Sequence, residues 1–351
     1  MGNTQSEEHQ KQLFQQKITP YGGVLIHNKN DLLFDFSNSG IEFQTLSKIS
    51  FQIDFLTNDI MGESYEFFKG HIYVKIYING ECQHQLRILS NTPKHEKTVT
   101  IEANQRVKII KVSEARYGIV CVRNILSLPI QSVPKDENKV KVEFIGASLV
   151  SGYGNDNEDN RQDHTDWQKT WCYHLCQQYN WEAMVHSYSC MGLVQDSSEN
   201  REEQIIERRR RIVGYDKESK FDFSTFKASY VIMNIGTNDF GGVVKEYMRI
   251  EFLEKMKQLI YELQENYGKN VKVIIVHGPM MNEPVRDVMR EIPDLFNDDL
   301  DTKKNISILS TYLSDKREER DLYWGPCWHP TELGHKVMAD QIIEQMKNLS
   351  I

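Results

Sequence analysis

Two short segments hold a serine and a histidine that together could carry out acyl transfer. Ser148 lies in FIGASLVSGYGN (144–155), directly after an apolar run, and its hydroxyl could act as a nucleophile. His329 lies in GPCWHPTELGH (325–335), at the expected start of a C-terminal helix, and its imidazole could be the general base. A helix that begins at Ser148 would also direct backbone N–H groups and its dipole toward a negative oxygen. The alternative is a purely structural role, in which this serine only caps the helix.

Two further segments could donate hydrogen bonds to the negative oxygen that develops in acyl transfer. Asn238, in IGTNDF (235–240), could donate through its amide, whereas Asp239 would cap a helix or brace the loop. Gly192, in HSYSCMGLVQD (186–196), would allow close approach of a backbone N–H to a ligand. Taken alone, the asparagine is equally typical of an Asx turn, and a single glycine says little.

The histidine segment lacks the acid that usually orients a catalytic imidazole. An aspartate two or three residues before His329 would hold the ring, but those positions are Cys327 and Pro326. A main-chain carbonyl that accepts the Nδ1 proton would leave Nε2 free for Ser148, as a Ser-His dyad requires. We expect such a carbonyl to lie about 2.7–3.2 Å from Nδ1. A Cys327 thiolate paired with the imidazolium is the alternative, although an ordinary thiol is mostly protonated at neutral pH.

The elements that must position these residues follow two successive patterns. Residues 20–130 alternate apolar with polar side chains between short turns, which predicts an antiparallel β-sandwich. Residues 131–139 are charged and contain a proline, and we expect a linker there. Residues 140–351 alternate continuous apolar runs with helical periodicity, which predicts an α/β domain with a parallel sheet flanked by helices. The candidate residues follow apolar runs, at the strand ends where ligands bind in such sheets.

Composition limits the class of protein. The 351 residues are 39% hydrophobic and 26% charged, as in a globular protein, and the net charge of −8 argues against general nucleic-acid binding. Arg208 to Arg211 follow several glutamates, and we expect a solvated helix surface there. Neither a signal peptide nor a transmembrane pattern is evident, so we expect a cytoplasmic protein whose six cysteines are free thiols.

The first residues, MGNTQSEEHQ, match the N-myristoylation pattern, with Gly2 after a removable Met and Ser6 at the required position. An ordinary polar tail over residues 1–19 is the alternative. A single myristoyl chain supports only weak membrane association, and the residues that follow add no polybasic anchor. Stable residence at a membrane would therefore need a partner protein.

Taken in order, the motifs GxSxxxGYG, SxxG, GTND and WHPxxxGH resemble the sequence blocks of the SGNH (GDSL-like) hydrolases. The likeness is closer still to the second family of carbohydrate esterases, which deacetylate sugars. Members of that family carry an N-terminal β jelly roll before a flavodoxin-like SGNH domain, have a GPM turn as in Gly278 to Met280, and place a Trp beside the catalytic His. The resemblance covers about residues 25–347 and implies no metal and no organic cofactor.

Carried over by position, the resemblance implies that Ser148 is the nucleophile and His329 the base. The backbone N–H groups of Ser148 and Gly192, with the Asn238 side chain, would be the oxyanion donors. A short acyl pocket or a sugar-stacking surface would be lined by three aromatic residues, Tyr153, Trp324 and Trp328.

Three positions depart from the family pattern. Ala147 and Cys327 stand where aspartates are usual, and Cys190 stands where the second block usually has a glycine. Cys190 and Cys327 should meet at one pocket, either as a pair that can be oxidised or as two inert thiols. The nucleophile, the base and the asparagine are retained.

These features favour a serine esterase that removes a small acyl group, most simply acetyl, from a sugar or similar ester. The main alternative is a weak or inactive SGNH protein that serves as a structural or binding subunit of an intracellular assembly, as the lost motif positions would suggest. A third hypothesis makes the jelly roll a glycan-binding module that the hydrolase domain supports.

Overall fold

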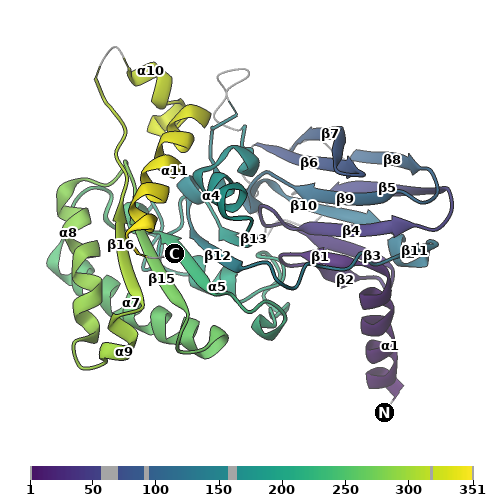
Figure 1. The fold of residues 1–351 in the computed structure, drawn as a ribbon, viewed down its shortest axis with the longest axis horizontal. Coiled ribbons are helices and arrows are strands. Elements are labelled where there is room, and N and C mark those ends of the chain that lie inside the picture. The colour runs from purple at the N-terminus through teal and green to yellow at the C-terminus, as the bar shows by residue number, and fades with distance from the viewer. Residues whose placement is uncertain (1, 57–69, 91–94, 157–163, 317–318, 350–351) are drawn as a thin grey trace. The chain divides into compact units, whose positions relative to one another are not determined.

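The computed structural model describes residues 2–56, 70–90, 95–156, 164–316 and 319–349, and its elements are drawn in Figure 1. The chain forms two compact units. The first contains residues 1–138 together with 211–219, and the second contains residues 139–210 and 220–351. The first boundary thus lies beside residue 140, where the apolar runs of the sequence begin, and a short later segment returns to the first unit.

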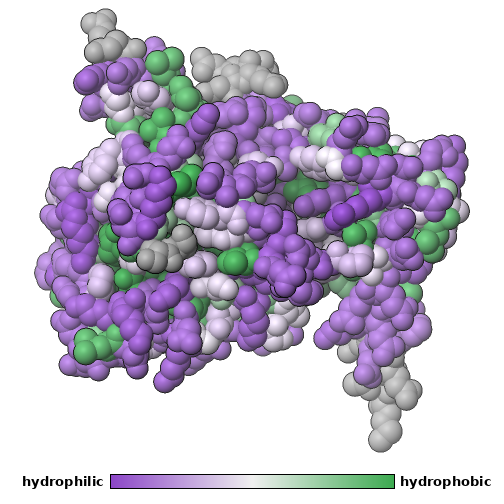
Figure 2. Space-filling view, viewed as in Figure 1, coloured by the Kyte–Doolittle hydropathy of each residue, from purple (hydrophilic) through white to green (hydrophobic). Residues whose placement is uncertain are grey.

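The visible surface is mostly hydrophilic, with hydrophobic residues scattered among polar ones (Figure 2). The apolar side chains are gathered instead into buried clusters inside each unit. None of the described helices has both the length and the apolar character needed to cross a membrane.

The first unit is a sandwich of two antiparallel sheets, as the alternating sequence pattern predicts. One sheet has the strand order β1-β4-β9-β6-β7 with β11 paired to β4, and the other has the order β2-β3-β10-β5-β8. The strands are β1 (Thr19–Tyr21), β2 (Leu25–His27), β3 (Asp31–Phe34), β4 (Gly40–Thr45), β5 (Ile49–Leu56), β6 (His71–Ile78), β7 (Glu81–Leu89), β8 (His95–Ile101), β9 (Arg106–Lys111), β10 (Ile119–Arg123) and β11 (Ile130–Gln131). Short 3₁₀ turns are η1 (Ala115–Tyr117) and η2 (Ile125–Ser127).

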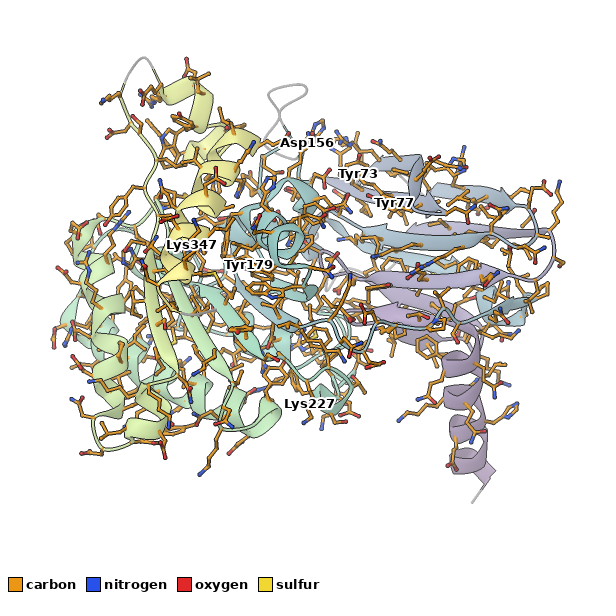
Figure 3. The ribbon with its side chains drawn as sticks, viewed as in Figure 1. Tyr73, Tyr77, Asp156, Tyr179, Lys227 and Lys347 are labelled. Atoms are coloured by element: carbon orange, nitrogen blue, oxygen red, sulfur yellow. The ribbon has the colours of Figure 1, made fainter. Side chains whose placement is uncertain are left out.

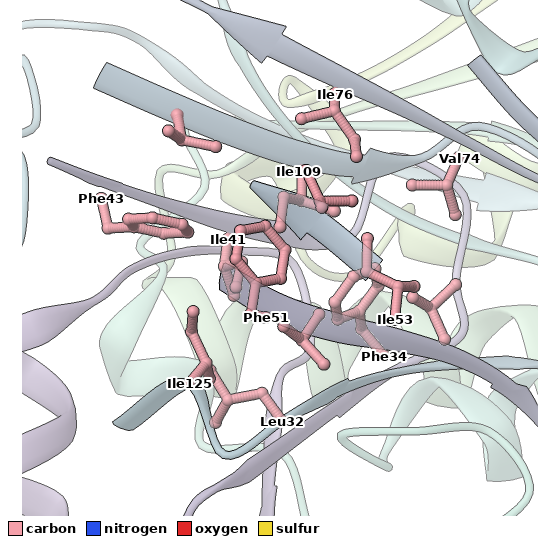
Figure 4. Packing of buried hydrophobic residues seen from close by; sticks show 14 of the residues in the cluster. Leu32, Phe34, Ile41, Phe43, Phe51, Ile53, Val74, Ile76, Ile109 and Ile125 are labelled. Atoms are coloured by element: carbon pink, nitrogen blue, oxygen red, sulfur yellow. The ribbon is translucent and has the colours of Figure 1, made fainter. Parts of the chain in front are cut away.

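The period-two pattern of the strands separates the two faces of each sheet. On β6, Ile72, Val74 and Ile76 are buried in the main core of the sandwich, and the alternating Tyr73 and Tyr77 lie on the opposite face of the sheet (Figure 3). Figure 4 shows the core side chains contributed by both sheets, among them Phe34, Ile41, Phe43, Phe51, Ile53 and Ile109.

A helix, α1 (Gly2–Lys17), precedes the sandwich. Leu13 and Phe14 pack against the sandwich core, and Lys17 Nζ donates a hydrogen bond of 2.7 Å to the Leu128 carbonyl. Part of the segment expected as a polar tail, residues 1–19, is therefore integrated into the fold. Gly2 begins this helix, but the side chains of residues 2–7 lie outside the described part, and acylation of Gly2 stays a prediction.

Residues 211–219, which we call the returning segment, pack within the first unit although they lie far along the sequence. Val213 is fully buried among Leu33, Ile119 and neighbouring apolar side chains. The Gly214 N–H donates a hydrogen bond of 2.7 Å to Asp35 Oδ2. Gly23 has no side chain because a Cβ there would lie 1.8 Å from the Ile212 carbonyl oxygen. The sandwich thus includes a short piece of chain that interrupts the sequence of the second unit.

The second unit contains a parallel sheet with the strand order β13-β12-β14-β15-β16, which is the flavodoxin-like order 2-1-3-4-5. The strands are β12 (Lys141–Gly146), β13 (Glu182–Ser187), β14 (Tyr230–Asn234), β15 (Lys272–His277) and β16 (Ile306–Ser310). Phe144, Ile232 and Ile274 pack against α4 (Trp171–Tyr179) and α11 (Glu332–Lys347) on one face, and the alternating Ile145 and Ile275 are buried as well. Burial on both faces explains the continuous apolar runs.

Helices connect these strands and flank the sheet, as expected for the fold class. They are α3 (Ser148–Ser151), α4 (Trp171–Tyr179), α5 (Ile205–Arg209), α6 (Thr237–Phe240), α7 (Glu246–Tyr267), α8 (Glu283–Glu291), α9 (Leu300–Lys303), α10 (Arg320–Tyr323) and α11 (Glu332–Lys347). The 3₁₀ turns are η4 (Trp167–Lys169), η5 (Phe223–Thr225), η6 (Ile292–Phe296) and η7 (Pro326–Trp328).

The expectation of a solvated surface at Arg208 to Arg211 holds for Arg210, which is exposed, but is wrong for Arg209 and Arg211. Arg209 is fully buried, and its guanidinium donates to both carboxylate oxygens of Glu143, at 2.7 and 2.9 Å. This pairing, with a hydrogen bond from His186, holds the pKa of Glu143 at about 2 despite the opposing effect of burial. Arg211, in the returning segment, is also buried and donates to the Gly214 carbonyl.

Replacing Val213 by alanine tests whether the returning segment holds the sandwich together. The substitution removes two methyl groups from a closed apolar cluster, so we expect the free energy of unfolding to fall by about 2 kcal/mol. Val243→Ala is the matched control, because Val243 is 64% exposed and its loss should change stability by less than about 0.5 kcal/mol. Urea denaturation measures both, and equal midpoints for the two variants would show that the segment contributes no stability.

Candidate active site

The candidate residues lie beyond strand ends that stand side by side. Gly146, the last residue of β12, is in register with Ser187 at the end of β13 and with Asn234 at the end of β14. Because the strands are parallel, the segments that follow them leave the same edge of the sheet. Ser148, the loop after β13 and Asn238 therefore follow neighbouring strand ends.

The Ser148 turn depends on close packing at Gly146. A Cβ at Gly146 would lie 2.4 Å from the Asn234 carbonyl oxygen and 2.5 Å from a Val150 methyl group, so only glycine fits. The helix that starts at Ser148, α3, has four residues. A macrodipole needs a longer run of aligned peptides, so the dipole expected to favour a negative oxygen contributes little here. The backbone N–H of Ser148 remains the candidate donor.

His329 is oriented by a main-chain carbonyl. Its Nδ1 lies 3.0 Å from the Cys327 carbonyl oxygen, within the interval expected for a hydrogen bond. A carbonyl oxygen only accepts, so Nδ1 must carry the proton and Nε2 is left as the acceptor. Cys327 has a left-handed backbone (φ 53°, ψ 32°), and Trp328 has a φ of 60°. The orienting group that the sequence lacks as a side chain is supplied by the backbone.

Neighbouring bonds fix the position of His329. The Gly325 N–H donates a hydrogen bond of 2.7 Å to the His329 carbonyl. Thr331 caps α11, because its hydroxyl oxygen accepts a hydrogen bond of 3.1 Å from the Gly334 N–H. The ring centroids of Tyr153 and His329 are 4.8 Å apart. The Tyr153 N–H donates a hydrogen bond of 3.0 Å to the Ser148 carbonyl. Tyr153 thus places the histidine beside the turn that carries the serine.

An ion bridge that sequence patterns do not predict connects the segments that carry Ser148 and His329. Lys169 Nζ lies 3.1 Å from Asp156 Oδ1 and 3.0 Å from Glu332 Oε2. Asp156, labelled in Figure 3, is buried in the loop after the Ser148 turn, and Glu332 begins α11 just beyond His329. Burial disfavours the charge of Lys169, but the hydrogen bonds and opposite charges of Asp156 and Glu332 together outweigh it and raise the pKa of Lys169 above its usual range, so the lysine stays charged.

Asn238, in the GTND motif, is hydrogen-bonded to the loop after β13. Its Nδ2 donates a hydrogen bond of 2.8 Å to the Met191 carbonyl, which uses one of the two amide hydrogens and orients the other. Gly236, just before α6, has a φ of 117°, a conformation that favours glycine and turns the chain from β14 into the helix.

The backbone of Gly192, the second predicted oxyanion donor, is hydrogen-bonded within its loop. Its N–H donates a hydrogen bond of 3.2 Å to Gln204 Oε1, and its carbonyl accepts a hydrogen bond of 3.2 Å from the Ile205 N–H. A Cβ at Gly192 would lie 2.2 Å from the Gln195 carbonyl oxygen and 2.5 Å from Asp239 Oδ2. The glycine is needed for this close packing, and its N–H is engaged. Two residues earlier, Cys190 has a φ of 72°, the left-handed conformation that glycine adopts most easily.

Asp239 braces the loop after β13, as one of the two sequence interpretations holds. Its Oδ1 accepts from the N–H groups of Leu193 at 2.8 Å and Val194 at 2.6 Å. The carboxylate is 1% exposed, and among the described residues no group donates to Oδ2. Burial outweighs the backbone hydrogen bonds and raises the pKa of Asp239 to about 6.

A second arginine that the sequence did not single out braces the GPM turn after β15. Arg286 is buried and donates to the carbonyls of Met281 at 2.7 Å, Gly278 at 3.1 Å and Thr311 at 3.2 Å. A Cβ at Gly278 would lie 2.7 Å from Leu149, so this turn packs directly against α3.

The predicted aromatic residues divide into two groups. Trp324 and Trp328 line a pocket of about 540 Å³ beside the histidine segment, together with four further residues, Arg320, Asp321, Gly325 and Cys327. Trp328 is 54% exposed, and Trp324 is fixed by a hydrogen bond of 2.9 Å from its indole nitrogen to the Ser314 carbonyl. Tyr153 packs on His329 instead. Cys190 and Cys327 are both free thiols, and among the described residues no cluster of His, Cys, Asp or Glu could hold a metal ion.

Comparison with known proteins gives consistent matches. The sequence model of the GDSL-like lipase/acylhydrolase family matches residues 142–342. The chain is 24% identical over 213 residues to the cellulase/esterase CelE of Acetivibrio thermocellus, and this match covers 59% of the chain and 25% of CelE. The chain thus spans about a quarter of the length of that relative.

Two solved structures share the fold across both units. An active-site mutant of a family two carbohydrate esterase from Clostridium thermocellum is 21% identical, with a TM-score of 0.76 over 95% of this chain and 98% of that chain. A family two carbohydrate esterase from Cellvibrio japonicus is 15% identical, with a TM-score of 0.73 over 95% of each chain. The expected fold, a jelly-roll sandwich followed by a flavodoxin-like SGNH domain, is confirmed. Because the family match spans more than half of the chain, the protein belongs to the GDSL-like lipase/acylhydrolase family.

Proposed function

We propose that the protein is a serine esterase that removes a small acyl group through a Ser-His dyad. Ser148 Oγ attacks the acyl carbon while His329 Nε2 accepts its proton, and the imidazolium then protonates the departing alcohol. Water activated by the same nitrogen releases the acid from the acyl-enzyme. The observation that carries this proposal is the 3.0 Å bond between His329 Nδ1 and the Cys327 carbonyl, because it selects the tautomer that the reaction needs.

The oxyanion that forms during attack needs preorganised donors. The Ser148 N–H and the second Nδ2 hydrogen of Asn238 are two of them, since the Met191 carbonyl uses only one amide hydrogen. The Gly192 N–H would have to leave Gln204 to serve as a third. The backbone N–H of Cys190, at the position where the family has a glycine and with a left-handed φ of 72°, is a further candidate. A backbone donor does not depend on the side chain it belongs to.

The relatives and the pocket support a sugar ester as the substrate. A family two carbohydrate esterase from Clostridium thermocellum has been solved with cellohexaose bound, and CelE carries both cellulase and esterase in its name. In this chain the half-exposed indole of Trp328, beside the base, offers an apolar face of the kind on which sugar rings stack. We therefore assign an acetyl or similarly small ester on a sugar as the substrate.

The first test is direct. Ser148→Ala should lower kcat/KM for 4-nitrophenyl acetate by about 10³-fold or more, because the proposed acyl-enzyme forms on this hydroxyl. Ser198→Ala, which changes an exposed serine of the same unit, should leave the rate within about twofold. Equal rates for wild type and Ser148→Ala would instead support the alternative of an inactive SGNH subunit in a larger assembly.

The second test asks what orients His329. If the Cys327 carbonyl does so, Cys327→Ala should lower kcat by less than about threefold, far from the roughly 10⁴-fold loss that follows when a protease triad loses its aspartate. Cys82→Ala changes another exposed cysteine and serves as the control. A loss as deep as that of His329→Ala would show that the thiol itself is required and would rule out the carbonyl.

The third test concerns the buried carboxyl of Asp239. Its folded-state pKa of about 6 lies above the ordinary value of 3.8, so the folded protein binds the proton more tightly than the unfolded chain does. The free energy of unfolding should therefore fall as the pH rises from about 4 to about 6, by roughly 3 kcal/mol from this group. Urea denaturation at a series of pH values gives the free energy of unfolding for the wild type and for Asp239→Asn. The wild-type value should fall with pH relative to that of the variant, and an identical pH dependence of the two would contradict the prediction.

A further inference from the structure

The pocket beside His329 is built from the chain that carries this base. Trp324 forms a β-bridge with Pro330, and the Gly325 N–H donates a hydrogen bond of 2.7 Å to the His329 carbonyl. Residues 324–330 therefore fold back on themselves. The pocket residue Cys327 accepts the Nδ1 hydrogen bond, and the pocket residue Trp328 directly precedes the base. A group held in this pocket therefore lies next to the proton-transfer centre.

Arg320 lies against one face of the Trp328 indole in this pocket. The guanidinium carbon is 3.6 Å from the ring centroid, a close cation–π contact. A guanidinium that stacks on a ring keeps the N–H groups at its edge available for a bidentate acceptor. Among the described residues, no carboxylate lies within ion-pair distance of Arg320, although its neighbour Asp321 lines the same pocket.

These features fit a particular ligand chemistry. Arginine is always charged, and its planar fork matches a carboxylate in two parallel hydrogen bonds. The free face of Trp328 can stack on a sugar ring, and Asp321 can accept hydrogen bonds from hydroxyl groups. A neutral sugar would use the ring and the hydroxyl acceptor but would leave the arginine fork without a partner.

We infer that the pocket formed by Arg320, Asp321 and Trp328 binds a sugar that carries a carboxylate, so that the preferred acyl acceptor is an acetylated hexuronic acid. This inference rests on the proposed esterase function and names its substrate class. The carboxylate pairs with Arg320, the ring stacks on Trp328, and the ester faces Ser148 and His329. Arg320 is then a specificity-determining residue.

The test compares two substrates that differ only at C6: mono-O-acetylated methyl glucuronoside and the corresponding methyl glucoside. The ratio of kcat/KM, acid over neutral, should exceed one in the wild type and fall at least about tenfold in Arg320→Gln, since a charge-assisted bidentate pair is lost. Lys316→Gln removes the same charge from an exposed residue outside the pocket and should leave the ratio unchanged. A wild-type preference for the glucoside, or an equal fall with both substrates, overturns the inference.

Binding separates this inference from the esterase proposal. Calorimetric titration of Ser148→Ala with unacetylated methyl glucuronoside should show binding that Arg320→Gln, made in the same background, weakens about tenfold. If 4-nitrophenyl acetate is not hydrolysed but this pattern holds, the acidic-sugar pocket stands and the esterase proposal fails. If the ester is hydrolysed but the glucuronoside binds no better than the glucoside, the esterase proposal stands and the pocket inference fails.

Discussion

The hydrogen bond from His329 Nδ1 to the Cys327 carbonyl is the constraint on which the candidate site depends. It is made across two residues with left-handed backbone, Cys327 and Trp328, where the chain turns the carbonyl toward the ring. Each such residue costs roughly 1–2 kcal/mol, which the Trp324–Pro330 bridge and the Thr331 cap help to offset. A carbonyl fixes the tautomer as well as a carboxylate does, but it carries no full charge to stabilise the imidazolium. The site therefore retains the geometry of a base with weaker electrostatic support.

At two of the three positions that depart from the family pattern, the backbone keeps the geometry that the usual residue would provide. At Cys327 a carbonyl stands in for the missing carboxylate, and at Cys190 the chain keeps the left-handed φ that a glycine would have. Nothing in the structure explains the alanine at position 147. The loop between the second and third blocks depends instead on a side chain, because Asp239 gathers the N–H groups of Leu193 and Val194 around one oxygen. Burial of that carboxylate opposes its charge, so the loop is held at an energetic cost.

Much of this could be predicted from sequence because it rests on local patterns. Alternation in residues 20–130 reflects one buried face per sheet, and continuous apolar runs such as 141–146 reflect two. Features that depend on partners distant in sequence could not be predicted. Arg209 is buried because Glu143 meets it, and Val213 is buried because the returning segment fills a gap in the sandwich. Gly192 resembled an oxyanion donor, but its packing against Asp239 appears only in three dimensions.

The distribution of backbone strain bears on whether the site is still used. Among the described residues other than glycine, eleven have positive φ, and six of these are asparagines, which tolerate that conformation. Of the remaining five, three are Cys190, Cys327 and Trp328, all within the second and fourth motif blocks. A subunit that served only as a scaffold would gain stability by relaxing these turns without losing a partner surface. Strain that is concentrated beside His329 and in the loop after β13 is the pattern expected if these segments carry out the proposed chemistry.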